Sequence, residues 1–175
     1  MKHALAITFA VGAVLSSVAH GGSPGARFNR DGVSFQVPRG WQLTIGRLNG
    51  VIDPVTLFTA STFRVRTEAP SNGMCAHALQ RAWRRDGAYV QLTEERDGAS
   101  RRRMLLRVPQ RPKHFQLDAK GAGGLCTPRD SGEIAFQEKG RAFYVFYGFG
   151  TEASRATRAQ AEALLDDLRI ARRKP

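Results

Sequence analysis

A hairpin signal near the C-terminus constrains the fold of this chain more than any other sequence feature. Residues 132–138 and 141–149 are two strand-like runs separated only by Lys139 and Gly140, and a two-residue connection with glycine is typical of a tight β-hairpin. The second run carries large apolar side chains on both of its faces. Such a strand has to be covered on both sides, so we predict that it lies inside an antiparallel sheet. The expected cross-strand pairs are Ile134–Val145, Phe136–Phe143 and Glu138–Arg141.

Shorter alternations of apolar and polar residues predict the other strands, and two segments with helical spacing predict helices. The expected strands cover residues 33–37, 41–45, 57–65, 88–95, 113–117 and 168–171. One helix is expected over residues 75–85. The second would be capped by Thr151 or Ser154 and would run to about Asp167. Its buried stripe is expected to be Ala161, Leu164, Leu165 and Leu168.

A second two-residue turn signal lies at Asp97 and Gly98. It predicts a hairpin between residues 88–95 and a strand over residues 101–108. The expected pairs of this hairpin are Val90–Leu105 and Glu94–Arg101. Because hairpins dominate the order of elements, the sequence predicts an α+β fold, a mainly antiparallel β-sheet packed by two helices.

Length and composition are those of one folded domain that follows a leader. Of the 175 residues, 42% are hydrophobic and 24% are charged, which is typical of a globular chain. We expect a signal peptide over 1–19, a flexible lead-in over 20–29, a single domain over 30–171 and a basic tail over 172–175. The leader combines Lys2, an apolar stretch, and small residues before a cut between Ala19 and His20. The prediction is a secreted, periplasmic or cell-envelope protein whose mature part has no transmembrane segment, and an uncleaved membrane anchor is the alternative.

Export to an oxidising compartment changes the oxidation state that we expect for the two cysteines, Cys75 and Cys126. In an oxidising compartment a lone pair favours one disulfide, which would stabilise the fold by roughly 4 kcal/mol in the chain-entropy model. Two buried free thiols, or one reactive nucleophile, are the alternatives. Two cysteines are too few for a four-cysteine zinc site, and the sequence predicts no metal and no cofactor.

The stretch from Asp31 to Trp41 reads DGVSFQVPRGW. A glycine, an alternating strand and a Pro-x-Gly-Trp start of a second strand resemble the beginning of bacterial Mog1/PsbP-like domains. In layout the chain is similar, over residues 30–171, to uncharacterised secreted bacterial proteins of that general type, and the stretch from Leu165 to Ile170 fits as well. The resemblance implies a sandwich that serves as a binding or assembly module, usually without catalysis. The metal and photosystem roles of photosynthetic members do not carry over, because none of their binding residues can be matched.

The chain is strongly basic, with 27 Lys and Arg against 15 Asp and Glu and a formal net charge of +12. Its densest run of cations lies between residues 81 and 113. The candidate polyanion-binding side chains are Arg81, Arg84, Arg85, Arg101, Arg103, Arg107, Arg111 and Lys113. Arginine forks suit oxyanions, so this face is expected to attract a cell-wall polymer or anionic lipid. A merely solvated basic surface is the alternative, and without a nucleic-acid-reading motif we expect no specific nucleic acid partner.

The sequence offers no catalytic constellation. It lacks the zinc-protease, nucleophile-elbow and phosphate-loop motifs. Glu94 and Glu95 are adjacent on a predicted strand and face opposite sides of it, which is the wrong geometry for an acid–base pair. We therefore expect no catalytic residues and predict an exported, non-enzymatic binding or assembly module with an unknown envelope or extracellular partner. The alternatives are a polyanion-binding protein that uses the arginine-rich face, and a hydrolase without a recognisable motif.

Overall fold

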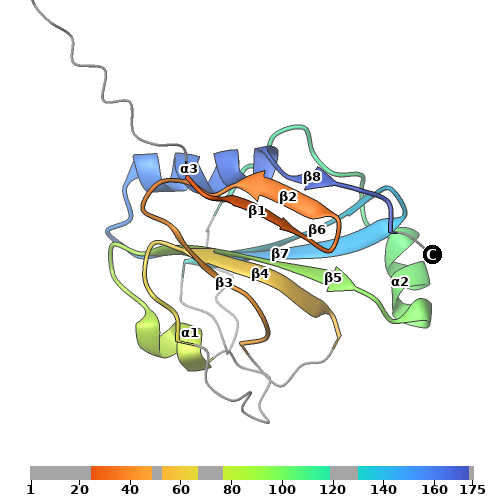
Figure 1. Ribbon diagram of the computed structural model, residues 1–175, viewed down its shortest axis with the longest axis horizontal. Helices are drawn as coiled ribbons and strands as arrows, with labels where there is room; N and C mark the ends of the chain where they lie inside the picture. Colours follow the sequence, from red (N-terminus) through yellow and green to blue (C-terminus); the bar gives the residue numbers. More distant parts are fainter. Residues whose placement is uncertain (1–24, 49–52, 67–76, 119–129, 174–175) are drawn as a thin grey trace, which may run out of the picture.

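Two antiparallel sheets and their helices form a layered α+β structure, which confirms the predicted class (Figure 1). The computed structural model describes residues 25–48, 53–66, 77–118 and 130–173. The strands are β1 (Arg27–Arg30), β2 (Val33–Gln36), β3 (Gln42–Thr44), β4 (Val55–Ser61), β5 (Ala88–Glu95), β6 (Ser131–Glu138), β7 (Arg141–Phe149) and β8 (Arg169–Ile170). The helices are α1 (His77–Ala82), α2 (Gly98–Leu105) and α3 (Arg155–Asp166).

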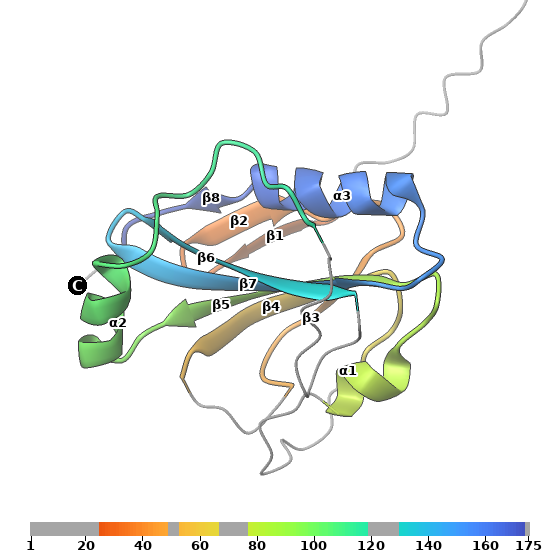
Figure 2. The ribbon, with the colours of Figure 1, turned by 180° about the vertical axis from the view of Figure 1, so that it is seen from behind.

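The sheets differ in size and lie face to face. One has three strands in the order β1-β2-β8, and the other has five in the order β3-β4-β5-β7-β6. The three-stranded sheet and α3 lie together over one face of the five-stranded sheet, which we call the covered face (Figures 1 and 2). The opposite, outer face carries α1 at one end and α2 at the other. The main core fills the space between the covered face and the layer that the three-stranded sheet and α3 form over it. There the rings of Phe28, Phe35 and Phe58 pack with centroids 4.5 to 5.3 Å apart.

The hairpin predicted near the C-terminus is confirmed in both position and register. β6 and β7 pair antiparallel with Ile134, Phe136 and Glu138 opposite their expected partners. Lys139 (φ 52°) and Gly140 (φ 75°) both have positive φ, which is the backbone of a type I′ turn. β7 has β5 on its other side, so it lies inside the sheet as its two apolar faces require.

The last helix is also confirmed. The Ser154 hydroxyl accepts a hydrogen bond from the Thr157 amide at 3.0 Å and so caps the first turn of α3. The expected stripe is buried against the core: Ala161, Leu164, Leu165 and Leu168. The chain then enters β8, which pairs with β2.

The predicted strand over residues 101–108, and with it the Val90–Leu105 and Glu94–Arg101 pairs, is wrong. Residues 98–105 form α2, because the Asp97 carboxylate accepts hydrogen bonds from the amides of Ala99 (3.1 Å) and Ser100 (2.8 Å). Asp97 is therefore a helix N-cap and not a turn residue. The edge of β5 that this hairpin would have used is paired with β7 instead.

The expected strand over residues 113–117 is also wrong, although its alternation has a structural cause. Phe115 and Leu117 are buried in the core. Their amides donate to carboxylates of α3, Phe115 to Asp166 at 2.8 Å and Leu117 to Glu162 at 3.0 Å. The segment is thus held along α3 by side-chain acceptors, and none of the strands in the described part of the chain pairs with it.

The start of the domain lies earlier than predicted. Residues 27–29, expected in a flexible lead-in, belong to β1, which pairs with β2 through a two-residue turn at Asp31 (φ 52°) and Gly32 (φ 71°). The expected strand over residues 41–45 appears as β3, but it joins the five-stranded sheet and is not a neighbour of β2. The stretch that resembles Mog1/PsbP-like domains therefore passes from one sheet to the other.

A buried ion network joins the two sheets near the α2 end of the core. Glu94 and Arg141 have side chains that are only 2% and 3% exposed, and Arg141 Nε donates to Glu94 Oε1 at 2.7 Å. The other Glu94 oxygen accepts from Arg96 Nε at 2.9 Å, and Arg96 also lies 3.5 Å from the Asp31 carboxylate. Arg141 Nη1 donates to the Ala171 carbonyl at 3.1 Å. Burial by itself would raise the pKa of Glu94, but the hydrogen bonds and charges of Arg141 and then Arg96 hold it below its usual range.

We predict that Glu94→Gln lowers the free energy of unfolding by about 3–5 kcal/mol, because it leaves the Arg141 charge buried without its carboxylate. Urea denaturation at neutral pH measures the change. Glu133→Gln is the matched control, since Glu133 on β6 has no ion-pair partner among the described residues; its effect should stay within about 0.5 kcal/mol. Adding Arg141→Met to Glu94→Gln should restore part of the loss. Equal effects of the two Glu→Gln changes would contradict a central role for the pair.

Candidate functional site

The structure separates the predicted polyanion-binding side chains instead of gathering them on one face. One group lies on α1 or directly after it, and comprises Arg81, Arg84 and Arg85. A second group lies on α2 or directly after it, and comprises Arg101, Arg103 and Arg107. Because α1 and α2 occupy opposite ends of the five-stranded sheet, these two groups do not form one continuous patch (Figures 1 and 2).

Several of these cations are engaged within the protein. Arg84 and Arg85 form exposed ion pairs, with Asp86 at 3.2 Å and Glu152 at 3.1 Å. Arg101 is half-buried on α2, whereas Arg103 and Arg107 are exposed. Exposed pairs of this kind contribute little to stability. The exposed arginines on α2 are Arg102 and Arg103, and Arg107 is exposed directly after the helix.

Arg111 has a structural role that the sequence did not reveal. Its guanidinium donates to the carbonyls of Leu165 (2.8 Å), Asp166 (2.8 Å) and Leu168 (2.5 Å), and it also lies 3.3 Å from Glu138. The last carbonyls of a helix have no partners within the helix and carry partial negative charge. Arg111 thus caps the C-terminus of α3 and is withdrawn from any ligand, while its neighbour Lys113 is exposed on an open, shallow surface.

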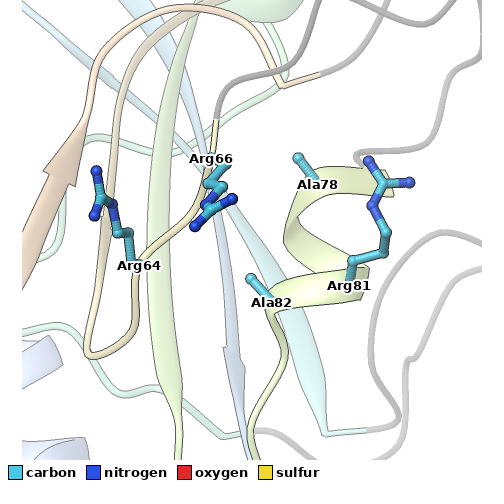
Figure 3. Close-up of a pocket in the computed structure, with 5 residues that line it drawn as sticks. All are labelled: Arg64, Arg66, Ala78, Arg81 and Ala82. Carbon is cyan, nitrogen blue, oxygen red and sulfur yellow. The ribbon is translucent and has the colours of Figure 1, made fainter.

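A compact arginine-lined hollow lies beside α1, and we call it the α1 pocket (Figure 3). It has a volume of about 230 Å³, and its described lining consists of Arg64, Arg66, Ala78, Arg81 and Ala82. The two alanines stand on the side of α1 that faces Arg66, and Arg81 rises from the other flank of the helix. No carboxylate is among these lining residues, and none of the described acidic side chains forms an ion pair with Arg64 or Arg66.

Alternation in the chain after β4 creates this pocket. Phe63 and Val65 are buried in a small second core with Leu79 of α1, so Arg64 and Arg66 between and after them point to solvent. Sequence reasoning found Arg81 but missed Arg64 and Arg66, because it searched for cations by density between residues 81 and 113. The signal that could have found them is the apolar–Arg–apolar–Arg alternation of residues 63–66.

A second hollow, the α2 pocket, lies between α2 and the outer face of the five-stranded sheet. It has a volume of about 310 Å³. Its described lining residues are Glu95, Ser100, Arg103, Met104, Arg107, Val108 and Tyr144. Glu95 is on the outer face because strand alternation turns it away from Glu94, as predicted from their adjacency.

The Glu95 carboxyl shares a proton with Asp53, which precedes β4. Desolvation, then the hydrogen bond and the charge of Asp53, raise the pKa of Glu95 to about 7. The pKa of Asp53 shifts in the opposite direction. Desolvation would raise this pKa, but hydrogen bonds from Glu95 and from the amides of Arg96 (3.0 Å) and Asp97 (2.9 Å) lower it. The proton is therefore held on Glu95 while Asp53 is ionised, and the pair carries one negative charge between the lowered pKa of Asp53 and about pH 7.

The predicted disulfide falls outside the described residues, as Cys75 and Cys126 both do. Within the described ranges, no three or more His, Cys, Asp or Glu side chains are arranged to hold a metal ion. None of the helices in that part of the chain has the length and apolar character needed to cross a membrane.

Comparison of the chain with family models, with curated proteins and with solved structures yields no significant match. The resemblance of residues 31–41 to Mog1/PsbP-like domains therefore stays a prediction.

The Asp53–Glu95 pair predicts an unusual pH dependence of stability. Because the folded protein binds a proton on Glu95 that the unfolded chain releases near the ordinary value of 4.5, the free energy of unfolding should fall as pH rises from 4.5 to about 7. The contribution of this one group is at most about 3 kcal/mol. Glu95→Gln keeps a donor toward Asp53 and should lack this decline in urea denaturation across the same pH range. An identical pH slope in both proteins would show that Glu95 is not the titrating group.

Proposed function

We propose that the protein is an exported, non-enzymatic binding module whose α1 pocket holds phosphate groups of an anionic envelope polymer. The observation that carries this proposal is the lining of the pocket by Arg64 and Arg66, neither of which forms an ion pair with a described carboxylate. Guanidinium groups bind phosphate through paired, charge-assisted hydrogen bonds. Export is supported by the signal-like pattern of residues 1–19.

The shape of the pocket favours a phosphate group over a bulky ligand. Ala78 and Ala82 leave space in front of α1, and the hollow is small. Arg64 and Arg66 are exposed and already oriented by the buried Phe63 and Val65, so binding needs little rearrangement of the backbone.

The wider surface supports an anionic partner as well. The net charge of +12 raises the local concentration of anions near every part of the molecule. A pocket adds selectivity to this general attraction, because Arg66 faces the alanines of α1 and Arg64 also lines the hollow.

Tripolyphosphate, a short probe of such a polymer, should bind the full chain with strong salt dependence. If the charges of Arg64 and Arg66 are engaged, a fourfold rise in salt should weaken binding about twelvefold, by analogy with duplex DNA. Arg64→Gln/Arg66→Gln should bind more weakly, and the same rise in salt should have little further effect on its binding. Isothermal titration calorimetry at two salt concentrations measures both quantities.

Arg172→Gln/Arg173→Gln is the matched control, since it removes two exposed charges beyond β8. It should keep the salt dependence of the unmodified chain. Equal losses in the two double variants would mean that tripolyphosphate responds to overall charge, and the α1 pocket would not be its site.

A further inference from the structure

The α2 pocket has a chemistry that the proposed polymer site does not use. Its cations come from α2 and the residues after it, its apolar surface from Met104, Val108 and the ring of Tyr144, and its carboxyl group from Glu95. A volume of about 310 Å³ lies at the lower end of the range for small-molecule sites. This combination fits a ligand with an acidic head and an apolar body.

We infer that the α2 pocket binds a small organic carboxylate, with its charge on Arg103 and Arg107 and its apolar part against Met104, Val108 and Tyr144. The Glu95 carboxyl, which lines the same pocket as the two arginines, controls this binding by gaining or losing its proton. The inference concerns a site at the opposite end of the sheet from the α1 pocket and does not depend on it (Figures 1 and 2).

The two arginines are placed to receive a carboxylate. Both line the pocket, Arg103 from α2 and Arg107 from the turn after it, where the Arg107 amide donates to the Met104 carbonyl at 2.9 Å. Arg103 Nη2 donates to Ser100 Oγ at 3.1 Å, which holds the guanidinium beside the pocket. Among the described residues no carboxylate lies within ion-pair distance of either arginine, so their charge is available to a ligand.

Tyr144 lines the sheet side of the pocket, and Thr93 lies beside Tyr144 outside the lining. Tyr144 stays a hydroxyl donor, because burial and then the charges of Glu95, Glu133 and Asp53 raise its pKa. Thr93 lies directly opposite Tyr144 in the β5–β7 register, on the same outer face. It is 4% exposed, and its Oγ1 has no hydrogen-bond partner within the part of the chain that is described.

Several charged or titratable groups lie around Glu95. Asp53 before β4 and Asp97 after β5 act on it directly, and Arg96 acts on Asp53. Arg103, Arg107 and Tyr144 line the same pocket, and Glu133 on β6 acts on Tyr144. Arg96 lies close enough to Asp53 to favour its negative charge. While Glu95 is protonated, the pocket therefore presents two cations and a neutral wall.

Loss of the Glu95 proton adds a negative charge to the lining of the α2 pocket. Once Glu95 ionises, its negative charge competes with the ligand for Arg103 and Arg107, and carboxylate binding should weaken. Linkage requires the converse as well, so a bound carboxylate makes Glu95 hold its proton more tightly. The pocket would thus bind its ligand at mildly acidic pH and release it above neutrality.

Benzoate is a suitable probe, because it stays ionised over the whole range and any pH dependence comes from the protein. Calorimetric titration of the full chain should show binding at about pH 6 that weakens about tenfold by about pH 8.5. Benzamide, its neutral counterpart, should bind weakly and without pH dependence. Glu95→Gln should bind benzoate at both pH values as the unmodified chain does at about pH 6.

Arg103→Gln should weaken benzoate binding about tenfold or more. Arg102→Gln, which removes the same charge from the neighbouring exposed residue outside the pocket lining, should leave it unchanged. Binding of benzoate that is equal at both pH values, or equal in the two arginine variants, would overturn the inference. Arg64→Gln/Arg66→Gln should not affect benzoate, so failure of this inference and failure of the proposed polymer site are distinguishable.

Discussion

The Glu94 carboxylate and the Arg141 guanidinium meet at 2.7 Å inside the protein, where either charge alone would be strongly destabilising. Each partner makes the burial of the other tolerable, and their remaining hydrogen bonds reach other elements. Arg141 Nη1 binds the Ala171 carbonyl after β8, and it would lie 3.2 Å from a Cβ added at Gly32. Glycine at this turn therefore lets the β1–β2 hairpin approach the arginine. Through these contacts one ion pair holds the three-stranded sheet in place over the five-stranded sheet.

That arrangement also decides where ligands can bind. With the three-stranded sheet and α3 on the covered face, the outer face of the five-stranded sheet has helices only at its two ends (Figures 1 and 2). β5 presents Gln91, Thr93 and Glu95 on this outer face, whereas its α1 end is apolar, with Tyr89 packed in the second core beside Leu79. Arginines from the helices and from the segments beside them line a hollow at each end. These hollows are the α1 and α2 pockets.

The candidate sites show how far sequence reasoning reached. Composition indicated an anion-attracting protein, and residue type indicated arginine as the binding group. Density along the chain, however, is a poor guide to density in space. It selected Arg111, which caps α3, and missed Arg64 and Arg66, which lie across from α1. The partnership of Glu95 with Asp53, 42 residues earlier in the chain, depends on how β4 pairs with β5 and has no local signal.

The sequence by itself determined the local elements with their inward and outward faces: the last hairpin with its register, the capped helix after it, and the opposite orientation of Glu94 and Glu95. These follow from side-chain periodicity and turn chemistry, which act over a few residues. Only the tertiary structure decided between equivalent local signals. Asp31-Gly32 forms a hairpin turn and Asp97-Gly98 opens a helix, although the dipeptide is the same. The difference arises because β1 pairs with an edge of β2, whereas the corresponding edge of β5 pairs with β7. Such long-range pairing is set by the packing of the whole chain.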